Sequence, residues 1–549
     1  MRFPCGRLVR LSQYGLAVAF LGLVCLASSL ICVFYFEQVE DMVQTALERQ
    51  TIFMNDSVFL EAWQNPPLTP ITKVYVFNVT NQEDVLAGNA SRFQIEEIGP
   101  FVYSARTIKR VVDWGQDGKT LTFQSKTTYQ YLPKESAFPD DRTTFVVVPN
   151  VLLMTGMLKT EVRPMSSFIK RNIIWPILTS TGYKTPFLHL SVADFVWGYE
   201  DELGCLDSDP STENEDLEED LFGDDFVREP AKPKMSERSY RRPDGRCMFG
   251  TLVGRNDTWE SPIMIQTGLG DIRSKGQLLK SKGKSSFGAW TPNSPCDSLI
   301  GTQEPSALPP QLPDTFNLFL GIMCRAIGME HDGIIQYGQI HAKRYVPVRN
   351  SFNFTQDSCY HVKSLHQLPP GALSASTCTD GAPLLVSFPH YEGGSPWYLD
   401  QVDGLTPSET ELHLPQIDVE PTFGAPLSIK IRFQVSLLLE RDSDFPPLTN
   451  LTSQQTLLPV FWVEEGFGSP PDRELTILQL GLHLPFYVAV GLPLMVTVTA
   501  LLLFGFAVLC CTHKTIFEPP THFVMSKYET VPCEDLTNHH LQSLSPTKS

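Results

Sequence analysis

Two long apolar stretches stand out in the pattern of hydrophobic and polar positions along the chain. Residues 11–36 contain no charged side chain, and residues 486–511 are apolar almost throughout. At about 1.5 Å of rise per residue, a helix of either length crosses the hydrocarbon core of a bilayer. The pattern therefore predicts two transmembrane helices, neither of which contains an Asp, Glu, Lys or Arg that would mark an ion path.

The charges beside these stretches predict their orientation. Three arginines precede the first stretch and carboxylates follow it, while a lysine follows the second. By the positive-inside rule, residues 1–10 and 512–549 are cytoplasmic tails, and residues 37–485 form an ectodomain. The apolar run continues well past the small residues at 27–29, which favours an uncleaved signal anchor over a cleaved signal peptide.

Within the ectodomain, period-two alternation predicts an antiparallel sheet. From Leu427 to Leu437, apolar and polar side chains alternate strictly. We expect one face of this strand to pack in a core and the other to face solvent. Residues 73–79 are apolar on both faces and are expected to form a central strand. Shorter extended runs are predicted at 93–112, 119–132, 335–341 and 383–389.

Residues 150–200 follow the helical period instead. We interpret them as two or three short helices inserted into a strand-rich body, the last of them over 187–197. Ordinary core helices with solvated lysines are one explanation, and a basic, apolar surface that captures ligands is the other. The residues of this candidate surface are Phe168, Ile169, Lys170, Arg171, Trp175 and Lys184.

Residues 206–246 differ in composition from the rest of the ectodomain. Eleven carboxylates lie between positions 206 and 229 with few apolar residues, and a basic run follows from 232 to 246. Such a segment cannot bury enough apolar surface to offset the entropy lost on ordering, so we expect a disordered loop. Calcium binding by the carboxylates is an alternative, but the spacing of an EF-hand is absent.

Modification signals agree with an extracytoplasmic ectodomain. Six Asn-X-Ser/Thr sequons and six of the twelve cysteines lie between the two apolar stretches. An even number of ectodomain cysteines fits three disulfides in an oxidising compartment, and spacing alone leaves their connectivity open. The predicted glycosylation sites are Asn55, Asn78, Asn89, Asn256, Asn353 and Asn450, and the ectodomain cysteines are Cys205, Cys247, Cys296, Cys324, Cys359 and Cys378. Near the membrane, Cys5, Cys510 and Cys511 are candidates for palmitoylation or, equally, for unmodified thiols in an apolar setting.

Composition and motifs exclude several classes of function. The net charge is −18, and no segment concentrates lysine and arginine as nucleic-acid binding requires. The sequence contains no nucleophile elbow, zinc-binding helix, phosphate-binding glycine loop or C-x-x-C pair. We therefore expect no enzyme, no metal or other cofactor, and no nucleic-acid partner. In the C-terminal tail, Tyr528 and Val531 form the Y-x-x-Φ pattern of a sorting signal, which predicts clathrin adaptors as partners and endocytic routing.

Five segments in order resemble the class B scavenger receptor family. They are Lys73–Asn81, Glu97–Tyr103, Val196–Asp201, Asp403–Pro407 and Ile417–Pro421. The resemblance extends over nearly the whole chain, including both apolar stretches. It implies an α+β membrane protein in which two transmembrane helices flank an antiparallel, β-barrel-like ectodomain with a helical apex and an internal apolar tunnel.

The resemblance also implies disulfide pairings. Many relatives have a further short-range disulfide just after the position of Cys359, but His361 occupies the expected place here. A bridge at the base of the acidic insertion would be a local addition. The expected pairs are Cys296–Cys359, Cys324–Cys378 and, as that addition, Cys205–Cys247.

The function that the resemblance implies is that of a lipid-handling receptor. We expect lipids or lipoprotein particles to bind at the helical apex, and fatty acids, phospholipids or sterols to pass through the tunnel toward the bilayer. We expect the protein at the plasma membrane, or in endosomal or lysosomal membranes. Two alternatives stay open, a trafficking or adhesion receptor for a soluble protein ligand and a two-span ligand-gated channel.

Overall fold

The computed structural model describes residues 8–516, except positions 56, 163–166, 181, 202, 204–238, 242–243, 324, 350, 354–357, 361–367 and 380. Helices and strands are mixed, and one large antiparallel sheet dominates. The chain divides into two compact units. The first combines Met1–Glu40 with Phe486–Ser549, and the second is Asp41–Pro485.

The first unit contains the two apolar helices. They are α1 (Leu8–Phe34) and the part of α11 (Asp472–Ile516) that begins at Phe486. In the described part of the chain, Asp472–Phe506 is the one helix long and apolar enough to cross a bilayer by itself. Phe20–Ile31 passes the same test only together with α2 (Phe36–Gln50), from which it is bent by 73°. The span expected over 11–36 therefore stays a prediction.

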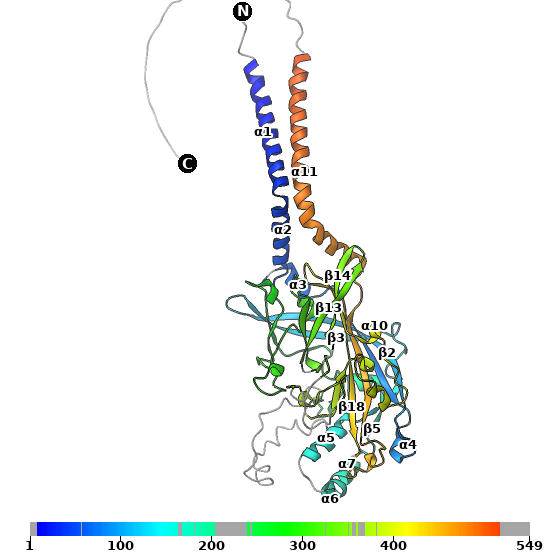
Figure 1. Cartoon of the computed structure of the whole chain (residues 1–549). Coiled ribbons are helices and arrows are strands. Elements are labelled where there is room, and N and C mark those ends of the chain that lie inside the picture. The colour runs from blue at the N-terminus through cyan, green and yellow to red at the C-terminus, as the bar shows by residue number, and fades with distance from the viewer. Residues whose placement is uncertain are drawn as a thin grey trace, which may run out of the picture. The chain divides into compact units, whose positions relative to one another are not determined.

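Small side chains lie where α1 and α11 touch. The Ser29 hydroxyl donates a hydrogen bond to the Pro493 carbonyl at 3.1 Å and also contacts the Thr497 hydroxyl. A Cβ added to Gly22 would lie 3.6 Å from the Ala500 carbonyl oxygen. Small residues of this kind let two helices approach closely within a membrane. Figure 1 shows the two helices side by side.

The second unit is built on a 14-stranded antiparallel sheet. Strand β1 pairs with β2 on one side and with β19 on the other, which confirms the central strand predicted over 73–79. Three short strands, β9 (Thr258–Trp259), β15 (Leu373–Ser374) and β16 (Leu384–Ser387), pair beside the main path. The main path runs in the order β11 (Leu278–Ser281), β10 (Ile263–Gln266), β3 (Thr120–Tyr131), β2 (Ile95–Trp114), β1 (Ile71–Val79), β19 (Gln455–Phe467), β18 (Ala425–Glu440), β17 (Gln416–Glu420), β14 (Ile340–Pro347), β13 (Arg325–Tyr337) and β12 (Thr315–Leu320).

A two-residue link joins the two edges of this sheet. Thr302 forms one bridge to Gln277, next to the edge strand β11, and another to Leu318 in the opposite edge strand β12. The Phe319 amide donates to the Thr302 carbonyl at 2.7 Å. Backbone hydrogen bonds of this link thus connect the two edge strands of the sheet, as the closure of a barrel requires.

The link depends on Gly301. Its carbonyl accepts a hydrogen bond from the Leu278 amide at 2.8 Å, so this residue connects directly to β11. Its φ of +86° lies in the left-handed region, and a Cβ at this position would overlap the Asn317 carbonyl oxygen of β12. Only glycine fits both demands.

The polar face of β18 does not meet solvent. Arg432, Gln434 and Ser436 are no more than 2% exposed. The His390 amide donates to the Gln434 side-chain oxygen at 2.8 Å, and the Tyr391 and Ser436 hydroxyls are 2.9 Å apart. A covering layer, residues 388–414, therefore lies over this face. The expected solvent-facing side is wrong, because alternation distinguishes two faces without showing what covers them.

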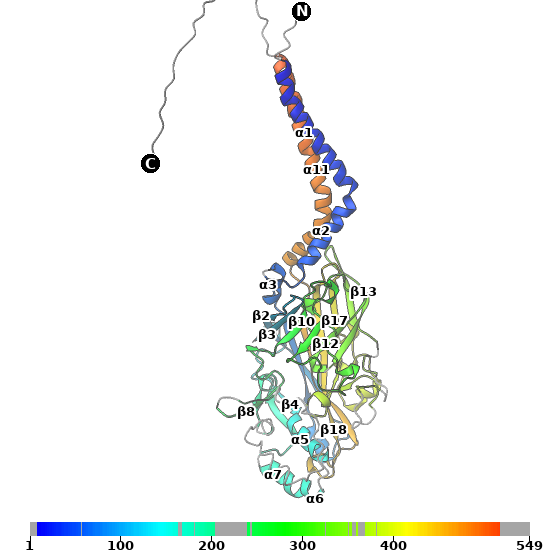
Figure 2. The same ribbon diagram turned by 90° about the vertical axis from the view of Figure 1, so that its left-hand side faces the viewer.

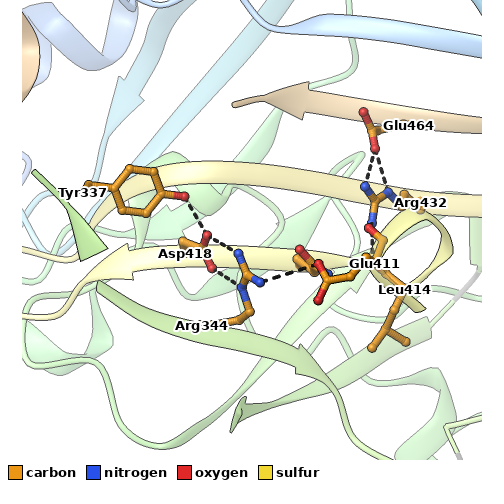
Figure 3. A network of polar contacts seen from close by, with 8 residues as sticks. Tyr337, Arg344, Glu411, Leu414, Asp418, Arg432 and Glu464 are labelled. Atoms are coloured by element: carbon orange, nitrogen blue, oxygen red, sulfur yellow. Dashed lines mark hydrogen bonds and ion pairs between the residues drawn. The ribbon is translucent and has the colours of Figure 1, made fainter. Parts of the chain in front are cut away.

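Ion pairs neutralise the charged groups that this covering buries (Figure 3). Arg432 pairs with Glu464 at 2.6 Å. Arg344 donates two hydrogen bonds to Asp418, at 2.8 and 2.9 Å, and the Tyr337 hydroxyl donates a third at 2.6 Å. The Asp418 side chain is only 1% exposed, so its charge is stabilised by these donors rather than by water.

Two sequence predictions of element type are wrong in detail. The helix expected over 187–197 begins as strand β5 (Phe187–Ser191), which pairs with β4 (Phe145–Pro149), and only then becomes α8 (Val192–Trp197). The extended run expected at 335–341 contains the turn between β13 and β14, where Gly338 has a φ of +60°. In both places strand pairing with a distant or returning segment decides the structure.

The charged insertion expected to be disordered over 206–246 lies mostly outside the described residues. Its described part includes β7 (Ser239–Arg241), which pairs with β8 (Cys247–Phe249), and β8 in turn pairs with β6 (Tyr199–Glu200). The predicted loop therefore ends earlier than composition indicated.

Short helices fill the remaining connections. They include the N-terminal α3, whose Trp63 packs with Phe53 and Phe123 of β3. The helical elements are α3 (Val58–Gln64), α4 (Gln82–Ala87), α5 (Val151–Val162), α6 (Ser167–Ile169), η1 (Lys170–Ile174), α7 (Trp175–Ser180), η5 (Ile272–Ser274), η6 (Pro295–Asp297), η7 (Pro305–Ala307), η8 (Gly321–Met323), η9 (Ser376–Cys378), η10 (Pro389–Tyr391), η11 (Pro396–Gln401), α10 (Thr410–His413) and η12 (Pro446–Leu448).

One lysine, buried beneath α3, has no acidic partner among the described residues. Lys275 is 2% exposed, and its ammonium group donates to the Leu308 carbonyl at 3.1 Å. The nitrogen lies 4.0 Å from the centre of the Phe59 ring and 5.5 Å from that of Phe53. Burial lowers the pKa of Lys275 from 10.5 to about 7.

Replacing Arg344 by Met should destabilise the second unit by about 3–5 kcal/mol, because Asp418 would stay buried without its ion partner. Thermal unfolding of the purified protein measures this. The double variant Arg344→Met, Asp418→Leu is the control, since it removes both charges and should recover much of the loss. Equal destabilisation by the single and double variants would show that the ion pair is not the cause.

Replacing Lys275 by Met should stabilise the protein most at neutral and acidic pH. Between pH 7 and 10.5 the unfolded chain binds a proton that folded Lys275 lacks, so the wild-type free energy of unfolding rises with pH in this window. Below pH 7 the full cost of the buried charge remains. Unfolding at pH 6 and pH 9 should show this slope in the wild type and a smaller one in Lys275→Met. The exposed neighbour Lys280→Met should keep the wild-type slope.

Candidate functional site

The candidate ligand surface is inserted between two paired strands. The chain leaves β4 at Pro149 and returns in β5 at Phe187, and these two residues are cross-strand partners. Between them lie α5, α6, the π-helix η1 and α7. Figure 2 shows α6 and α7 at the end of the second unit farthest from α3. The strand pair holds both ends of this helical insertion in place.

The π-helix decides which apolar residues of the insertion face outward. A π-turn contains one residue more than an α-turn, so residues five apart share a face across η1. Accordingly, Phe168, Ile173 and Ile177 are 69%, 47% and 57% exposed. The residue after each of them is half-buried. We call Phe168, Ile173 and Ile177 the apical patch.

Two of the three predicted basic residues lie near this patch at the surface. Arg171 and Lys184 are exposed, and the Arg171 guanidinium donates a hydrogen bond to the Ser443 carbonyl. Lys170 is only 7% exposed and lies on the inner side of η1. Of the three predicted basic residues, Arg171 and Lys184 are therefore the two available to a ligand at the surface.

The predicted apolar contacts divide in a similar way. Trp175 packs edge-on against the buried ring of Phe445, with 4.7 Å between ring centres, and Ile169 is half-buried. Ile173 and Ile177 are exposed at the surface instead of Trp175 and Ile169. The sequence analysis did not include either of them in the candidate surface. An α-helical period puts Phe168 and Ile173 on different faces, so only knowledge of the π-turn could have joined them.

The apolar face of β18 continues across the sheet as one row of side chains. Cross-strand partners share a face, and the pairing runs from Ile431 through Glu465, Thr72 and Tyr103 to Tyr131. The row is apolar or aromatic except for Thr72 and Glu465. Glu465 is therefore a carboxylate on the same face as the core of the second unit.

Burial governs the ionisation of Glu465 in this row and of Tyr129, which lies in β3 on the same face as Tyr131. It raises the pKa of the Glu465 carboxyl group. Burial also raises the pKa of Tyr129, to which the nearby Glu465 charge contributes. Both side chains nevertheless keep part of their surface accessible to solvent. A protonated, neutral Glu465 is thus favoured more than for an exposed glutamate.

A disulfide joins Cys296 and Cys359, the pairing that the family resemblance implies. Their Cα atoms are 5.9 Å apart across 63 positions of sequence. Cys247 and Cys378 are also disulfide-bonded. Their expected partners, Cys205 and Cys324, lie outside the described residues, so these two pairings stay predictions.

The other predicted sites are distributed as follows. Asn78 is half-buried in β1, and its side-chain oxygen accepts a hydrogen bond from the Val147 amide at 2.8 Å. The other five sequon asparagines are exposed. Cys510 and Cys511 belong to α11. Cys5, His361, Tyr528 and Val531 lie outside the described residues. Among the described residues, no group of three or more potential metal ligands is present.

Comparison with known proteins gives a consistent picture. The sequence model of the CD36 family matches residues 20–511. Lysosome membrane protein 2 of Homo sapiens is 24% identical over 426 residues, which cover 77% of this chain and 80% of that protein. Sensory neuron membrane protein 1 of Apis mellifera is 25% identical over 445 residues, covering 80% of each. The same protein of Bombyx mori is 25% identical over 433 residues, covering 78% of each.

Serine at each position of the apical patch should change the free energy of unfolding by no more than about 0.5 kcal/mol, because exposed side chains contribute little to stability. Trp175→Ala should cost about 2 kcal/mol or more, since it removes the packing against Phe445. Thermal unfolding of Phe168→Ser, Ile173→Ser, Ile177→Ser and Trp175→Ala tests the division. A loss at Ile173 or Ile177 as large as at Trp175 would mean that these residues belong to the core.

Proposed function

The chain belongs to the CD36 family, and from this we propose that it is a class B scavenger receptor that binds lipids or lipoprotein particles and transfers lipid through its sheet-enclosed interior. Membership makes it a membrane receptor. The binding of lipid, the route of transfer and the residues involved are the proposal.

The observation that carries the proposal is the apical patch with its two exposed cations. Three large apolar side chains stand at the surface of one short helical segment, where folding alone gives no reason to expose them. Arg171 and Lys184 add positive charge to a chain whose net charge is −18. An apolar contact beside a cation suits an amphipathic ligand with an anionic headgroup.

The interior row supports the second half of the proposal. Glu465 and Tyr129 are surrounded by enough protein to raise their pKa, yet part of each side chain is accessible to solvent. Both properties are expected of groups that line an internal space. An acyl chain that enters an apolar space gains about 0.8 kcal/mol per CH₂ removed from water, so transfer needs no covalent step. We propose that this space is the apolar tunnel.

The proposed topology has two spans and both termini in the cytoplasm. The contacts between α1 and α11 at Ser29 and Thr497 support two helices that associate within a membrane. The flanking charges support the orientation. We propose residence in the plasma membrane or in endosomal and lysosomal membranes. The name of the relative lysosome membrane protein 2 supports the lysosomal membrane.

A receptor for a soluble protein is the alternative that the surface also suits, because the apical patch fits an apolar protein interface. Clathrin adaptors would then act through the Tyr528–Val531 signal. A ligand-gated channel has less support. The Thr497 hydroxyl is bonded to Pro493 and Ser29, and the Thr499 hydroxyl donates to the Met495 carbonyl at 2.8 Å. These hydroxyl groups are satisfied within the helices rather than by pore water.

The double variant Arg171→Glu, Lys184→Glu should reduce uptake of an anionic fluorescent phospholipid by roughly three- to tenfold, because the two reversals together change the attraction to a headgroup by about 1 kcal/mol at a screened surface. Cells that express the protein at matched surface density provide the measurement. Lys134→Glu, Lys284→Glu is the matched control, since both lysines are exposed outside the apex. Equal uptake by the apical variant and the control would remove the apex from the mechanism.

A further inference from the structure

The covering layer ends in the single helical turn α10, which lies against β18. The Arg432 guanidinium of β18 donates hydrogen bonds to the Glu411 and Leu414 carbonyls, at 3.0 and 2.6 Å (Figure 3). Of the four residues of this described turn, only His413 is buried, at 7% exposed. Arg432 thus holds the backbone of the turn, and His413 is the side chain that packs into the protein.

A hydrogen bond defines the protonation of His413. The Glu409 amide donates to its Nδ1 atom at 2.8 Å. Because an amide nitrogen only donates, Nδ1 carries no proton, and the ring is neutral in this arrangement. A proton added to Nδ1 would turn the acceptor into a donor, and the Glu409 amide would lose its partner. The geometry is therefore that of an uncharged imidazole.

The ring that stacks on His413 is a donor at both of its nitrogen atoms. The centres of the His390 and His413 rings are 4.2 Å apart. Nδ1 of His390 lies 2.8 Å from the Thr406 carbonyl oxygen, and Nε2 lies 2.7 Å from a carboxylate oxygen of Glu97. One proton therefore lies on Nδ1, and a second is shared between Nε2 and Glu97. A positive charge on His413 would be repelled by this ring.

Burial and the neighbouring charges favour the neutral form of His413. Burial lowers the pKa of His413 from 6.5 to about 4, and the charge of His390 adds to this effect. Arg432 acts in the same direction, while Glu97 and Glu392 oppose it without reversing it. The charged groups around the ring are His390 and Glu392 of the covering layer, Glu97 of β2, Arg432 of β18 with its partner Glu464 of β19, and Glu409 and Glu411 at α10 itself.

We propose that His413 is an acid-sensitive switch, which in its neutral form holds α10 and the end of the covering layer on the sheet and on protonation releases them. The beginning of the layer stays attached through other contacts. They are the hydrogen bond from the His390 amide to Gln434 and the contact between the Tyr391 and Ser436 hydroxyls.

Release changes the surface on this side of the sheet. The covering layer and strands β1 and β2 line a cavity of about 500 Å³, with Phe77 and Glu97 on the strands and His390 and Leu405 on the layer. Leu405 belongs to the segment that leads into α10, so release of the turn loosens one wall of this cavity. A receptor that reaches acidic endosomes or lysosomes, as proposed above, would uncover this surface there. The switch itself does not depend on lipid transfer.

The pH range of the switch follows from its two states. When α10 is released, His413 meets solvent and regains its ordinary pKa of 6.5, whereas its pKa is about 4 in the attached state. Between these values the released state binds a proton that the attached state lacks. Attachment is therefore strongest above pH 6.5 and weakens as the pH falls toward 4. From pH 7.4 to pH 5, the ratio of released to attached molecules should rise about 25-fold.

Hydrogen–deuterium exchange of the purified full chain in a maltoside detergent measures this ratio. After correction for the intrinsic pH dependence of exchange, protection of the amides in 405–415 should fall about 25-fold from pH 7.4 to pH 5. The amides that pair β18 with β19 should keep their protection. Unchanged protection in 405–415, or an equal fall in β18 and β19, would overturn the proposal.

Two variants connect the effect to one ring. His413→Asn offers an amide oxygen as acceptor but does not titrate, so protection of 405–415 should be nearly equal at the two pH values. His341→Asn replaces an exposed histidine of β14 and is the matched control, which should keep the wild-type dependence. The wild-type dependence in His413→Asn would refute the switch. Should His413→Asn fail to fold, the wild-type comparison of 405–415 with β18 and β19 decides the question alone.

Discussion

Closure of the large sheet is the constraint on which the second unit depends. An open sheet of this length would present two edges, each with unpaired backbone groups. Here the Gly301–Thr302 link bonds to β11 on one side and to β12 on the other, so the two edge strands are connected through it. Closure also gives every strand an inner and an outer face. The row through Glu465 lies on one of these faces. His390 and the covering layer lie on the other.

The outer face carries as much specific structure as the inner one. Residues 388–414 cover the polar side of β18, and the charged groups buried there form ion pairs, as in the Arg432–Glu464 and Arg344–Asp418 pairs. Buried polar groups are costly unless satisfied, so this layer fits in one arrangement rather than several. The left-handed backbone at His390 and Tyr391 is the local strain within that arrangement.

The sequence allowed a prediction of structure where a local repeat of apolar residues, or local composition, determines the element that forms. The central strand over 73–79 and the long alternating strand after Leu427 were readable because strand periodicity is local. The Cys296–Cys359 pairing came from family resemblance, since spacing alone cannot choose a partner. What could not be read depends on distant segments. The strand at Phe187 requires its partner β4, and burial of the polar face of β18 requires the covering layer.

The candidate sites show the same division. Arg171, Lys184 and Phe168 were predicted because basic residues lie among apolar residues at helical spacing in that segment. Ile173 and Ile177 escaped because the π-turn changes the spacing, and no residue pattern announces it. A cavity lined by Phe77, Glu97, His390 and Leu405 could not be predicted, since its walls come from β1 and β2 and, far along the chain, from the covering layer.

The pairing of Pro149 with Phe187 has an evolutionary consequence. The helical insertion begins and ends at one cross-strand pair of the short β4–β5 hairpin. Its sequence and length can therefore diverge without shifting the register of the large sheet. Selection can therefore change the surface of this insertion, which is the proposed ligand site, while the large sheet stays constant. Family members that bind different ligands are expected to differ most between the positions of Pro149 and Phe187.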